Sequence, residues 1–236
     1  MIRALIIDDE LHAREELEHL VRNTGAFDIL GCCTNAIDAL RRIRTEKPEL
    51  LFLDIEMPAL NGFELLAMIE EDLMPHVVFV TAYNEHALKA FEEKTLDYLL
   101  KPVSPERFLK TVDKVREAIH RGDPPRYQAE PLRHIPCQFS NRVKLIPPAT
   151  VDYVFSDATG IHVVTSEGQF FTELTLRVLE KRTALLRCQK QFLVNPENID
   201  EIRLQGNGLA EIRTFLGHTL PVSRRYLRQL KGALEL

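Results

Sequence analysis

The sequence has few of the features that mark exported or membrane-spanning proteins. No stretch approaches the roughly 20 consecutive apolar residues needed to cross a bilayer. The N-terminus turns acidic at the eighth residue and has neither the apolar core nor the small-residue cleavage site of a signal peptide. We therefore expect the chain to stay in the cytoplasm.

Cysteine is scarce, and its spacing does not suit a metal site. The four cysteines are Cys32, Cys33, Cys137 and Cys188, and no pair has the CxxC spacing of zinc ligands. Cys32 and Cys33 are adjacent, so on a strand their side chains would point to opposite faces. We predict buried thiols rather than a zinc site or a disulfide framework.

Charge is unevenly distributed along the 236 residues, which are enough for two ordinary domains. Residues 1–120 contain 14 Lys and Arg against 23 Asp and Glu, a net charge of -9. Residues 121–236 contain 16 against 12, a net charge of +4. The two halves therefore predict different partners, with any polyanion binding in the second half.

Short apolar runs alternate with amphipathic stretches in the first half. The runs have the length of strands, and the stretches between them repeat apolar residues every three or four positions, as helices do. The predicted strands are 4–8, 27–33, 50–54, 76–82 and 96–100, and the predicted helices are 11–23, 36–46, 62–72, 85–94 and 104–121. Five successive β-α units predict a doubly wound parallel sheet with helices on both faces.

The pattern changes after the stretch "GDPPRYQAEP", which contains a glycine and three prolines. We predict one domain over residues 1–120, a linker over 121–133 and a second domain over 134–236. The second domain is expected to be mostly antiparallel β structure. Its predicted strands are 142–146, 151–157, 161–174, 185–195, 199–204, 209–215 and 219–223, and its predicted helices are 174–182 and 224–234. This order of elements contains no helix-turn-helix.

Polar side chains follow several predicted strands of the first half. Asp8 and Asp9 end the first strand, Asp54 ends the third, Thr81 ends the fourth, and Lys101 follows the fifth. Parallel strands present their carboxyl ends at one edge, so these side chains should gather there. Crowded carboxylates repel unless a cation lies among them, and hard oxygen ligands suit Mg²⁺. A carboxylate such as Asp54 can also act as a nucleophile and form an acyl phosphate.

Each of these residues also has an ordinary structural explanation. Asp8 and Asp9 precede a predicted helix and could cap it. Thr81 could be a plain strand residue, Lys101 a loop residue, and Tyr98 a half-buried core aromatic. Their coincidence at the ends of separate strands in one alternating series favours a functional site.

Four motifs, "LIIDDE", "FLDIEMPALNG", "VVFVTAY" and "DYLLKPV", resemble the signature of receiver domains of two-component response regulators. The resemblance covers roughly the first half of the chain and implies a flavodoxin-like, five-stranded parallel fold. It implies that Asp54 accepts phosphate from a sensor histidine kinase. Asp8, Asp9, Asp54 and the backbone carbonyl of Glu56 would then arrange Mg²⁺.

The same resemblance assigns roles to three further residues. Lys101 and Thr81 would engage the phosphoryl group, and Tyr98 would be the aromatic switch that turns inward as Thr81 moves. The affected face would comprise residues 85–94, 96–100 and 107–119, and it would pair two receivers as a homodimer. A two-state element of this kind is what a conformational signal requires.

In the second half, "LLRCQKQFLVNPENIDEI", "LPVSRRYLRQLK" and "FTELTLRVLE" resemble the LytTR DNA-binding domains of LytR/AlgR-family regulators. The resemblance implies a mainly β domain that binds promoter DNA, typically at direct repeats, and a membrane-bound LytS-type kinase as partner. Carried over by motif position, the DNA contacts are Lys190, Arg224 and Thr159, with Gln189 and Arg225 as neighbouring candidates.

One departure bears on the base specificity. Relatives often have His-Arg after "RC", where this chain has Gln189-Lys190. Lys190 keeps the charge but loses the bidentate fork that suits guanine, so both base and phosphate contact stay open. Arg224 and Arg225 could instead be a solvated first helical turn, but cations are unfavourable at a helix N-terminus.

The leading prediction is a phosphorylation-controlled transcription regulator that is not an enzyme beyond its own phosphoryl transfer and slow autodephosphorylation. Two alternatives stay open. The carboxylates could form a Mg²⁺-dependent phosphatase site that turns over small substrates. The β half could bind protein or RNA instead of DNA.

Overall fold

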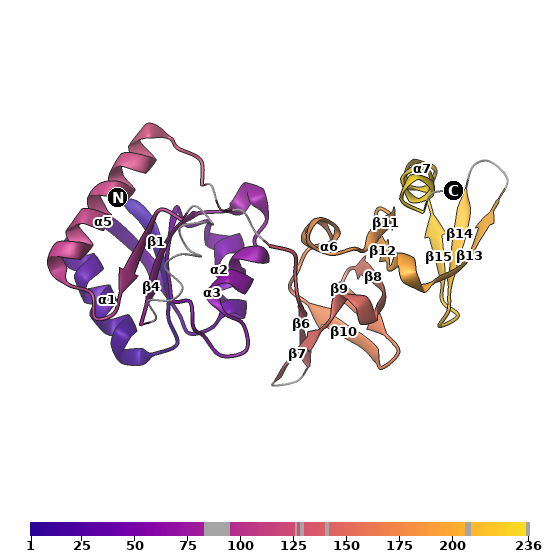
Figure 1. Cartoon of the computed structure of the whole chain (residues 1–236), viewed down its shortest axis with the longest axis horizontal. Coiled ribbons are helices and arrows are strands. Elements are labelled where there is room, and N and C mark those ends of the chain that lie inside the picture. Colours follow the sequence, from indigo (N-terminus) through magenta and orange to yellow (C-terminus); the bar gives the residue numbers. More distant parts are fainter. Residues whose placement is uncertain (83–94, 126, 128–129, 140–141, 206–208, 235–236) are drawn as a thin grey trace. The chain divides into compact units, whose positions relative to one another are not determined.

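The computed structural model describes residues 1–82, 95–125, 127, 130–139, 142–205 and 209–234. The chain divides into two compact units, Met1–Glu130 (unit 1) and Pro131–Leu236 (unit 2). Figure 1 labels many of the helices and strands along the chain. Within the described residues, no helix is long and apolar enough to cross a membrane.

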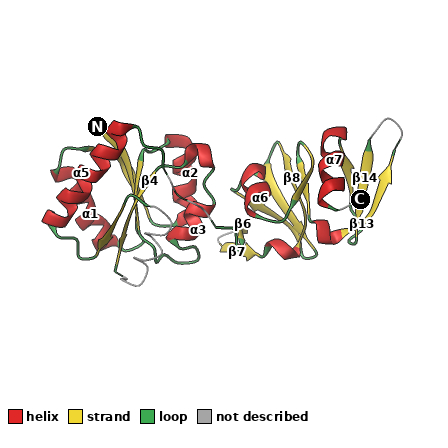
Figure 2. Ribbon diagram, turned by 45° about the horizontal axis from the view of Figure 1, so that its top comes forward, coloured by secondary structure: helices red, strands yellow, loops and turns green. Residues whose placement is uncertain are grey.

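Unit 1 is built around a five-stranded sheet in the order β2-β1-β3-β4-β5, and all neighbouring strands are parallel. Its strands are β1 (Ile2–Ile7), β2 (Phe27–Cys33), β3 (Leu50–Leu53), β4 (His76–Thr81) and β5 (Asp97–Leu100). Its helices are α1 (Leu11–Asn23), α2 (Ala36–Glu46), α3 (Gly62–Ala67) and α5 (Pro105–Arg121), with a short 3₁₀ helix η1 (Glu71–Leu73). Helices α1 and α5 cover one face and α2 and α3 the other (Figure 2). The predicted doubly wound fold is confirmed.

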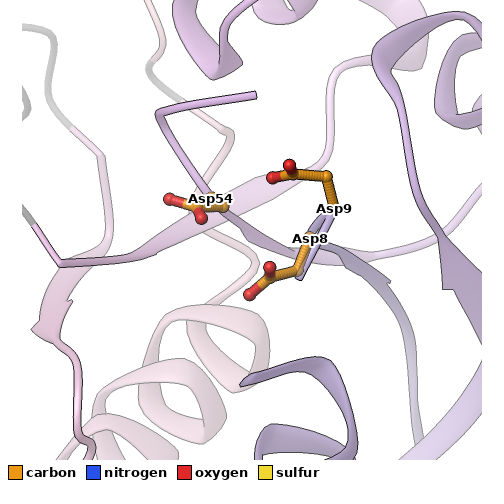
Figure 3. Close-up of side chains that lie close together, drawn as sticks. All are labelled: Asp8, Asp9 and Asp54. Atoms are coloured by element: carbon orange, nitrogen blue, oxygen red, sulfur yellow. The ribbon is translucent and has the colours of Figure 1, made fainter. Parts of the chain in front are cut away.

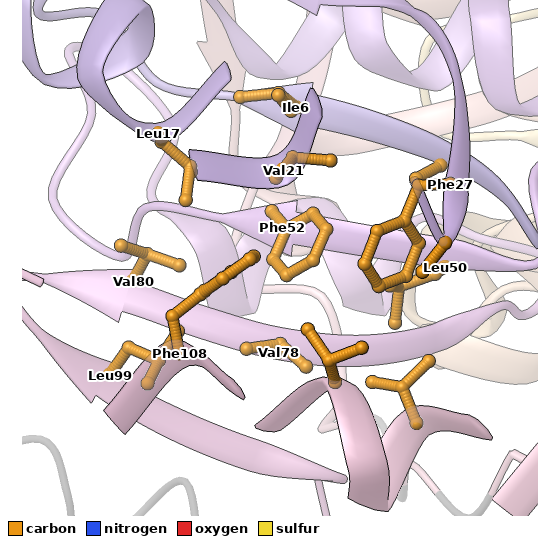
Figure 4. Packing of buried hydrophobic residues seen from close by; sticks show 14 residues of the cluster. Ile6, Leu17, Val21, Phe27, Leu50, Phe52, Val78, Val80, Leu99 and Phe108 are labelled. Atoms are coloured by element: carbon orange, nitrogen blue, oxygen red, sulfur yellow. The ribbon is translucent and has the colours of Figure 1, made fainter. Parts of the chain in front are cut away.

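Aromatic packing anchors one face of this sheet. The Phe52 ring on β3 lies 5.5 Å from Phe27 and 5.7 Å from Phe108 between ring centroids (Figure 4). Leu17 and Val21 of α1 pack into the same cluster. Each fully buried side chain of this size contributes about 1.5–3 kcal/mol, so this cluster fixes α1 and α5 on the sheet.

Two expectations about helices have different outcomes. The predicted helix over residues 62–72 ends already at Ala67, where Met68 and Ile69 form i to i-3 hydrogen bonds to Leu65 and Leu66. Met68 and Ile69 are buried, so tertiary packing overrides the helical periodicity there. The predicted helix over residues 85–94 lies outside the described residues.

Unit 2 contains two antiparallel sheets, which confirms the predicted β character. The seven-stranded sheet has the order β11-β12-β8-β9-β10-β6-β7, and the three-stranded sheet has the order β13-β14-β15. The strands are β6 (Ile135–Phe139), β7 (Arg142–Ile146), β8 (Val151–Asp157), β9 (Gly160–Thr165), β10 (Gly168–Thr172), β11 (Leu186–Gln189), β12 (Phe192–Val194), β13 (Ile199–Leu204), β14 (Ala210–Thr214) and β15 (Thr219–Val222). Helix α6 (Leu176–Arg182) and helix α7 (Arg224–Ala233) complete the unit, with 3₁₀ helices η3 (Pro148–Thr150) and η4 (Pro196–Asn198).

Strand β6 was not predicted, because Pro136 lies within it and proline removes a ladder donor. The strand forms nevertheless between β10 and β7, and the carbonyl of Pro136 accepts a 2.7 Å hydrogen bond from the Thr172 hydroxyl. Ile135 and Cys137 on either side are fully buried. Burial of the neighbours thus outweighs the unfavourable propensity of one residue.

The cysteines are free thiols, and three of the four are buried as predicted. Cys33, Cys137 and Cys188 are buried and Cys32 is half-buried. Burial raises the pKa of Cys137 and Cys188 to about 12. These thiols therefore remain protonated at neutral pH and behave as small apolar side chains.

Candidate functional site

Three carboxylates meet at the carboxyl edge of the parallel sheet in unit 1. Oxygen atoms of Asp8, Asp9 and Asp54 all lie within 4.8 Å of one another (Figure 3). Asp8 is 1% exposed and Asp54 is 5% exposed, while Asp9 is half-buried. The structure thus brings together the three acids that the sequence singled out.

Strand pairing explains why these acids converge. Strands β1 and β3 are neighbours although β2 lies between them in sequence, so their ends form the switch point of the doubly wound sheet. The amide of Asp54 donates to the carbonyl of Ile7 at 2.8 Å, and the amide of Asp8 donates to the carbonyl of Cys33 at 3.1 Å. Backbone bonds therefore hold both acids immediately beyond the last core residues.

Lys101 supplies the positive charge of the cluster. Its Nζ lies 2.7 Å from Oδ2 of Asp54, 2.9 Å from Oδ2 of Asp8 and 3.4 Å from Oε2 of Glu10. Its amide donates to the carbonyl of Thr81 at 2.8 Å, and a cis peptide bond joins it to Pro102. Lys101 thus connects the end of β5 to the acids of β1 and β3.

The surroundings shift two pKa values in this cluster. Burial acts to lower the pKa of Lys101, but the carboxylates of Asp54 and Asp8 outweigh it and raise that pKa above its usual value. Burial raises the pKa of Asp8, against the opposing effect of Lys101. The ammonium is therefore firmly charged, whereas a buried acid beside it is costly to ionise.

The loop between β3 and α3 is closely packed against Asp54. The amide of Gly62 donates to the carbonyl of Ile55 at 2.8 Å, and a Cβ at Gly62 would lie 2.6 Å from the carbonyl oxygen of Asp54. Asn61 begins α3 with a capping box that it forms with Glu64. Glu56 is in this loop, and its amide donates to Oδ1 of Asp54 at 3.4 Å.

The two predicted switch residues are on adjacent strands. Thr81 is fully buried at the end of β4, and Tyr98 is half-buried on β5, where it pairs with Phe79. Burial raises the pKa of Tyr98, and the charge of Asp54 adds to the shift. Tyr98 is therefore close enough to respond to a change of charge at Asp54.

A second charged cluster was missed by sequence reasoning. Both carboxylate oxygens of Asp97 accept 2.8 Å hydrogen bonds from Arg107, and Asp97 also accepts from Thr111 and Lys114. The Arg107 guanidinium also donates to the carbonyl of Tyr98 at 2.8 Å. The three partners are spaced i, i+4 and i+7 on α5, which places them on one helix face. That spacing is the signal that could have revealed the cluster.

In unit 2, two backbone hydrogen bonds gather the predicted DNA-contacting segments at one place. The amide of Ser156 at the end of β8 donates to the carbonyl of Gln191 at 2.9 Å. The amide of Ser223 before α7 donates to the carbonyl of Cys188 at 3.1 Å. The β8–β9 turn and the start of α7 therefore both lie beside the β11–β12 turn, which contains Lys190.

The five predicted contacts differ in how their side chains are engaged. Lys190, Arg224 and Arg225 are exposed, and the Arg225 guanidinium lies 5.5 Å from the ring of Tyr226. The side-chain oxygen of Gln189 accepts from the amide of Gln191 at 2.9 Å.

Thr159 is exposed in the β8–β9 turn, but its hydroxyl is already engaged. It donates to Asp157 at 2.6 Å and lies 2.8 Å from Nε2 of His162. A DNA contact through this hydroxyl would therefore compete with local hydrogen bonds.

Comparisons with known proteins agree with this geometry. Residues 4–113 match the response regulator receiver domain, and residues 141–235 match the LytTr DNA-binding domain. An uncharacterized response regulatory protein of Shewanella oneidensis is 48% identical over 231 residues, which cover 98% of each chain. The chain belongs to the LytTR family of two-component response regulators.

A second relative and one solved domain are also similar to this chain. The transcriptional regulatory protein BtsR of Salmonella typhi is 46% identical over 241 residues and is covered fully, as is this chain. Among solved structures, the response regulatory domain of mrkE from Klebsiella pneumoniae is 31% identical, with a TM-score of 0.47, and covers 51% of this chain and 99% of its own. As a response regulator with a LytTR domain, this protein acts on DNA, and a histidine kinase is its implied partner. The predicted family and fold are confirmed, as is the prediction of a two-component response regulator that acts on DNA.

Proposed function

We propose that Asp54 is the phosphoacceptor of this regulator. One observation carries the proposal: Asp54 ends a buried strand, lies 2.7 Å from the Lys101 ammonium, and shares a 4.8 Å cluster with Asp8 and Asp9. A nucleophilic carboxylate needs a cationic environment to receive a phosphoryl group, and this cluster supplies the fixed part of it. Glu10, 3.4 Å from Lys101, adds a fourth acid.

The acids fit a magnesium site. Three carboxylates contact the Lys101 ammonium, and Asp9 lies within 4.8 Å of two of them, which leaves a surplus of negative charge on hard oxygen donors. Asp8, Asp9, Asp54 and the backbone carbonyl of Glu56 would hold Mg²⁺. When bound, the ion would neutralise the phosphoryl oxygens during transfer.

Asp54, Lys101 and Thr81 have distinct roles in the proposed phosphoryl transfer. An oxygen of Asp54 attacks the phosphorus of the kinase phosphohistidine; a P–O bond forms as the P–N bond breaks, and the imidazole leaves. Lys101 exchanges its ion pair with Asp54 for the new phosphoryl oxygens, and the Thr81 hydroxyl donates to them. A cavity of about 280 Å³, lined in part by Lys101, Pro102 and Leu17, borders this site and would admit part of the partner.

Phosphorylation would then change the surface of the receiver. As Thr81 is drawn toward the phosphoryl group, Tyr98 turns inward, and the face that includes β5 and α5 reorders. We propose that this face forms the homodimer. Pairing places two LytTR domains on direct repeats of a promoter and raises affinity through effective concentration.

The DNA contacts proposed are Lys190, Arg224, Arg225, Gln189 and Thr159, on three segments joined at the β11–β12 turn. Residues 121–133 would link the two domains. The partner would be a membrane-bound LytS-type histidine kinase that phosphorylates the regulator in the cytoplasm, where its promoters are.

Incubation with acetyl phosphate and Mg²⁺ tests the proposal and separates it from the phosphatase alternative. The wild-type chain should gain one phosphate by intact mass, and Asp54→Asn should gain none while its far-ultraviolet circular dichroism is unchanged. Asp28→Asn, an exposed acid on β2, is the matched control and should label normally. Labelling of Asp54→Asn would place the acceptor elsewhere, and continuous turnover of many phosphoesters would indicate a phosphatase.

A further inference from the structure

Helix α7 has an unusual charge content. Its ten residues include Arg224, Arg225, Arg228 and Lys231 and no acidic residue. The first three are exposed and Lys231 is half-buried. Within the part of the chain that the structure describes, none of the four forms an ion pair with a carboxylate.

Several other cations of unit 2 are paired with acids. Lys144 lies 2.6 Å from Glu167, Arg187 lies 2.8 Å from Glu180, and Arg203 lies 2.9 Å from Glu201. Lys190, in the β11–β12 turn, has an exposed side chain and, among the described residues, no acidic partner. Among the described residues of unit 2, cations without an acidic partner therefore lie mainly on α7 and the turn beside it, with Arg142 on β7 as a further case.

This arrangement is unfavourable for the helix itself. Arg228 follows Arg224 by four residues and precedes Lys231 by three, so like charges adjoin along one face and repel. Arg224 and Arg225 also lie at the positive end of the helix dipole. The Ser223 side chain makes no capping hydrogen bond that would offset this cost.

The opposite face of α7 supplies the stability. Leu230 is 1% exposed and packs with Ile212, Leu220 and Val222 of the three-stranded sheet, and Leu227 packs against the same cluster. The apolar face thus fixes the helix in place, while Arg224, Arg225 and Arg228 are exposed and have no acidic partner among the described residues. A polyanion beside these arginines would relieve the repulsion.

The helix is also continuous with the proposed DNA-contacting segments. Its start is bonded through Ser223 to Cys188, two residues before Lys190. From Arg224 to Lys231 the helix advances about 10 Å, which equals the rise of roughly three nucleotides along one strand. The basic residues of α7 therefore extend the proposed DNA-binding site from the β11–β12 turn along the length of the helix.

We propose that Arg228 and Lys231 form a stripe on α7 that contacts the phosphates of one DNA strand irrespective of base sequence. The inference rests on the DNA-binding function and assigns to α7 the sequence-independent share of the affinity. Arg228 and Lys231 position the duplex, so that residues at the start of the helix and in the β11–β12 turn meet the base edges.

Salt titration of the full-length chain on a random-sequence duplex tests this proposal. The slope of log affinity against log salt is negative, and each lost phosphate contact makes it shallower by about 0.9. The double variant Arg228→Gln/Lys231→Gln should therefore make the slope shallower by about 2. This corresponds to roughly 60-fold weaker binding at 0.1 M salt. The single variants should each give about half of the change in slope.

The control variant Arg142→Gln/Lys144→Gln removes the same charge from β7, the opposite edge of the seven-stranded sheet from β11. It should leave the slope near that of the wild type. Equal losses in both double variants would show a general net-charge effect and overturn the proposal, as would an unchanged slope in Arg228→Gln/Lys231→Gln. A wild-type chain that binds no duplex at low salt would instead refute the DNA-binding function itself.

Discussion

The two units place the charges of their proposed sites in opposite environments. In unit 1, Asp8 and Asp54 are almost fully buried at the carboxyl edge of the parallel sheet, and Lys101 contacts both of them. In unit 2, Lys190 and Arg224 are exposed on a turn and a helix start. A small, doubly charged ion or phosphoryl group requires fixed geometry and weak screening, which burial provides. A polyanion requires an open surface that it can reach by diffusion.

Each unit also buries a carboxylate whose role is structural. Asp97 in unit 1 is held by Arg107, Thr111 and Lys114. Asp152 in unit 2 is fully buried, and its Oδ2 accepts 2.8 Å hydrogen bonds from Thr214 and His218. Substituting Asp97 or Asp152 should lower the free energy of unfolding, in contrast to substituting an acid of the proposed phosphorylation site.

The largest effect is expected from Asp152→Ala. Asp152 is on β8, Thr214 ends β14, and His218 lies between β14 and β15, so the carboxylate joins the seven-stranded sheet to the three-stranded sheet. Removing it leaves the Thr214 and His218 donors without their acceptor and should lower the free energy of unfolding of unit 2 by about 3 kcal/mol. Hydrogen exchange of the β8 and β14 amides measures this value.

The control is Asp200→Ala, an exposed acid 3.8 Å from Arg213. Exposed pairs contribute about 0.2–1 kcal/mol, so exchange should change little. A loss in Asp152→Ala no greater than in this control would mean that the two sheets are joined by apolar packing alone.

The acidic cluster of unit 1 and the Asp152–His218 pair show which sites can be predicted from the sequence and which cannot. Asp8, Asp54 and Lys101 could be predicted because parallel strands deliver their carboxyl ends to one edge, whatever the packing. The Asp152–His218 pair could not, because 66 residues separate the partners and only the folded sheets bring them together. Local rules failed in the same way at Pro136 and at the end of α3, where burial of neighbouring side chains decided the outcome.

The next effect concerns Asp97 and pH. Burial acts to raise the pKa of Asp97, but the donors on α5 outweigh it and hold that pKa well below its usual range. A depressed pKa means that the carboxylate stabilises unit 1 above the unfolded value of about 3.9, and that this stability is lost as the pH falls below it.

Asp97→Asn should therefore lower the free energy of unfolding of unit 1 by about 2 kcal/mol at pH 7. The difference from the wild type should shrink as the pH falls below about 4. Urea unfolding at several pH values, followed by circular dichroism, measures both effects. Asp113→Asn, an exposed acid on α5, serves as control; a pH-independent difference for Asp97→Asn would contradict the electrostatic explanation.

For an exposed functional charge the comparison predicts the reverse, a loss of binding without a loss of stability. Arg224→Ala should weaken binding to an operator found by footprinting by about 1–2 kcal/mol, or roughly 5- to 30-fold, relative to a random duplex. Its unfolding free energy should be unchanged or slightly higher, because a cation leaves the positive end of the helix dipole. Labelling by acetyl phosphate should be normal. Equal weakening on both duplexes would show that Arg224 contacts phosphate rather than a base.

The smallest effect tests whether unit 1 pays in stability for its acidic cluster. Asp9 is half-buried within 4.8 Å of Asp8 and Asp54, so without metal its charge adds repulsion, and Asp9→Asn should stabilise unit 1 by about 0.5 kcal/mol. Mg²⁺ at ten times its dissociation constant should stabilise the wild type by about 1.4 kcal/mol, and the variant much less. Thermal unfolding in EDTA and in Mg²⁺ should therefore reverse the order of the two proteins. Asp28→Asn is the control and should not change its stability order relative to the wild type between the two buffers. If it did, or if Asp9→Asn were less stable than the wild type in both buffers, the idea that the acidic cluster destabilises unit 1 without metal would be wrong.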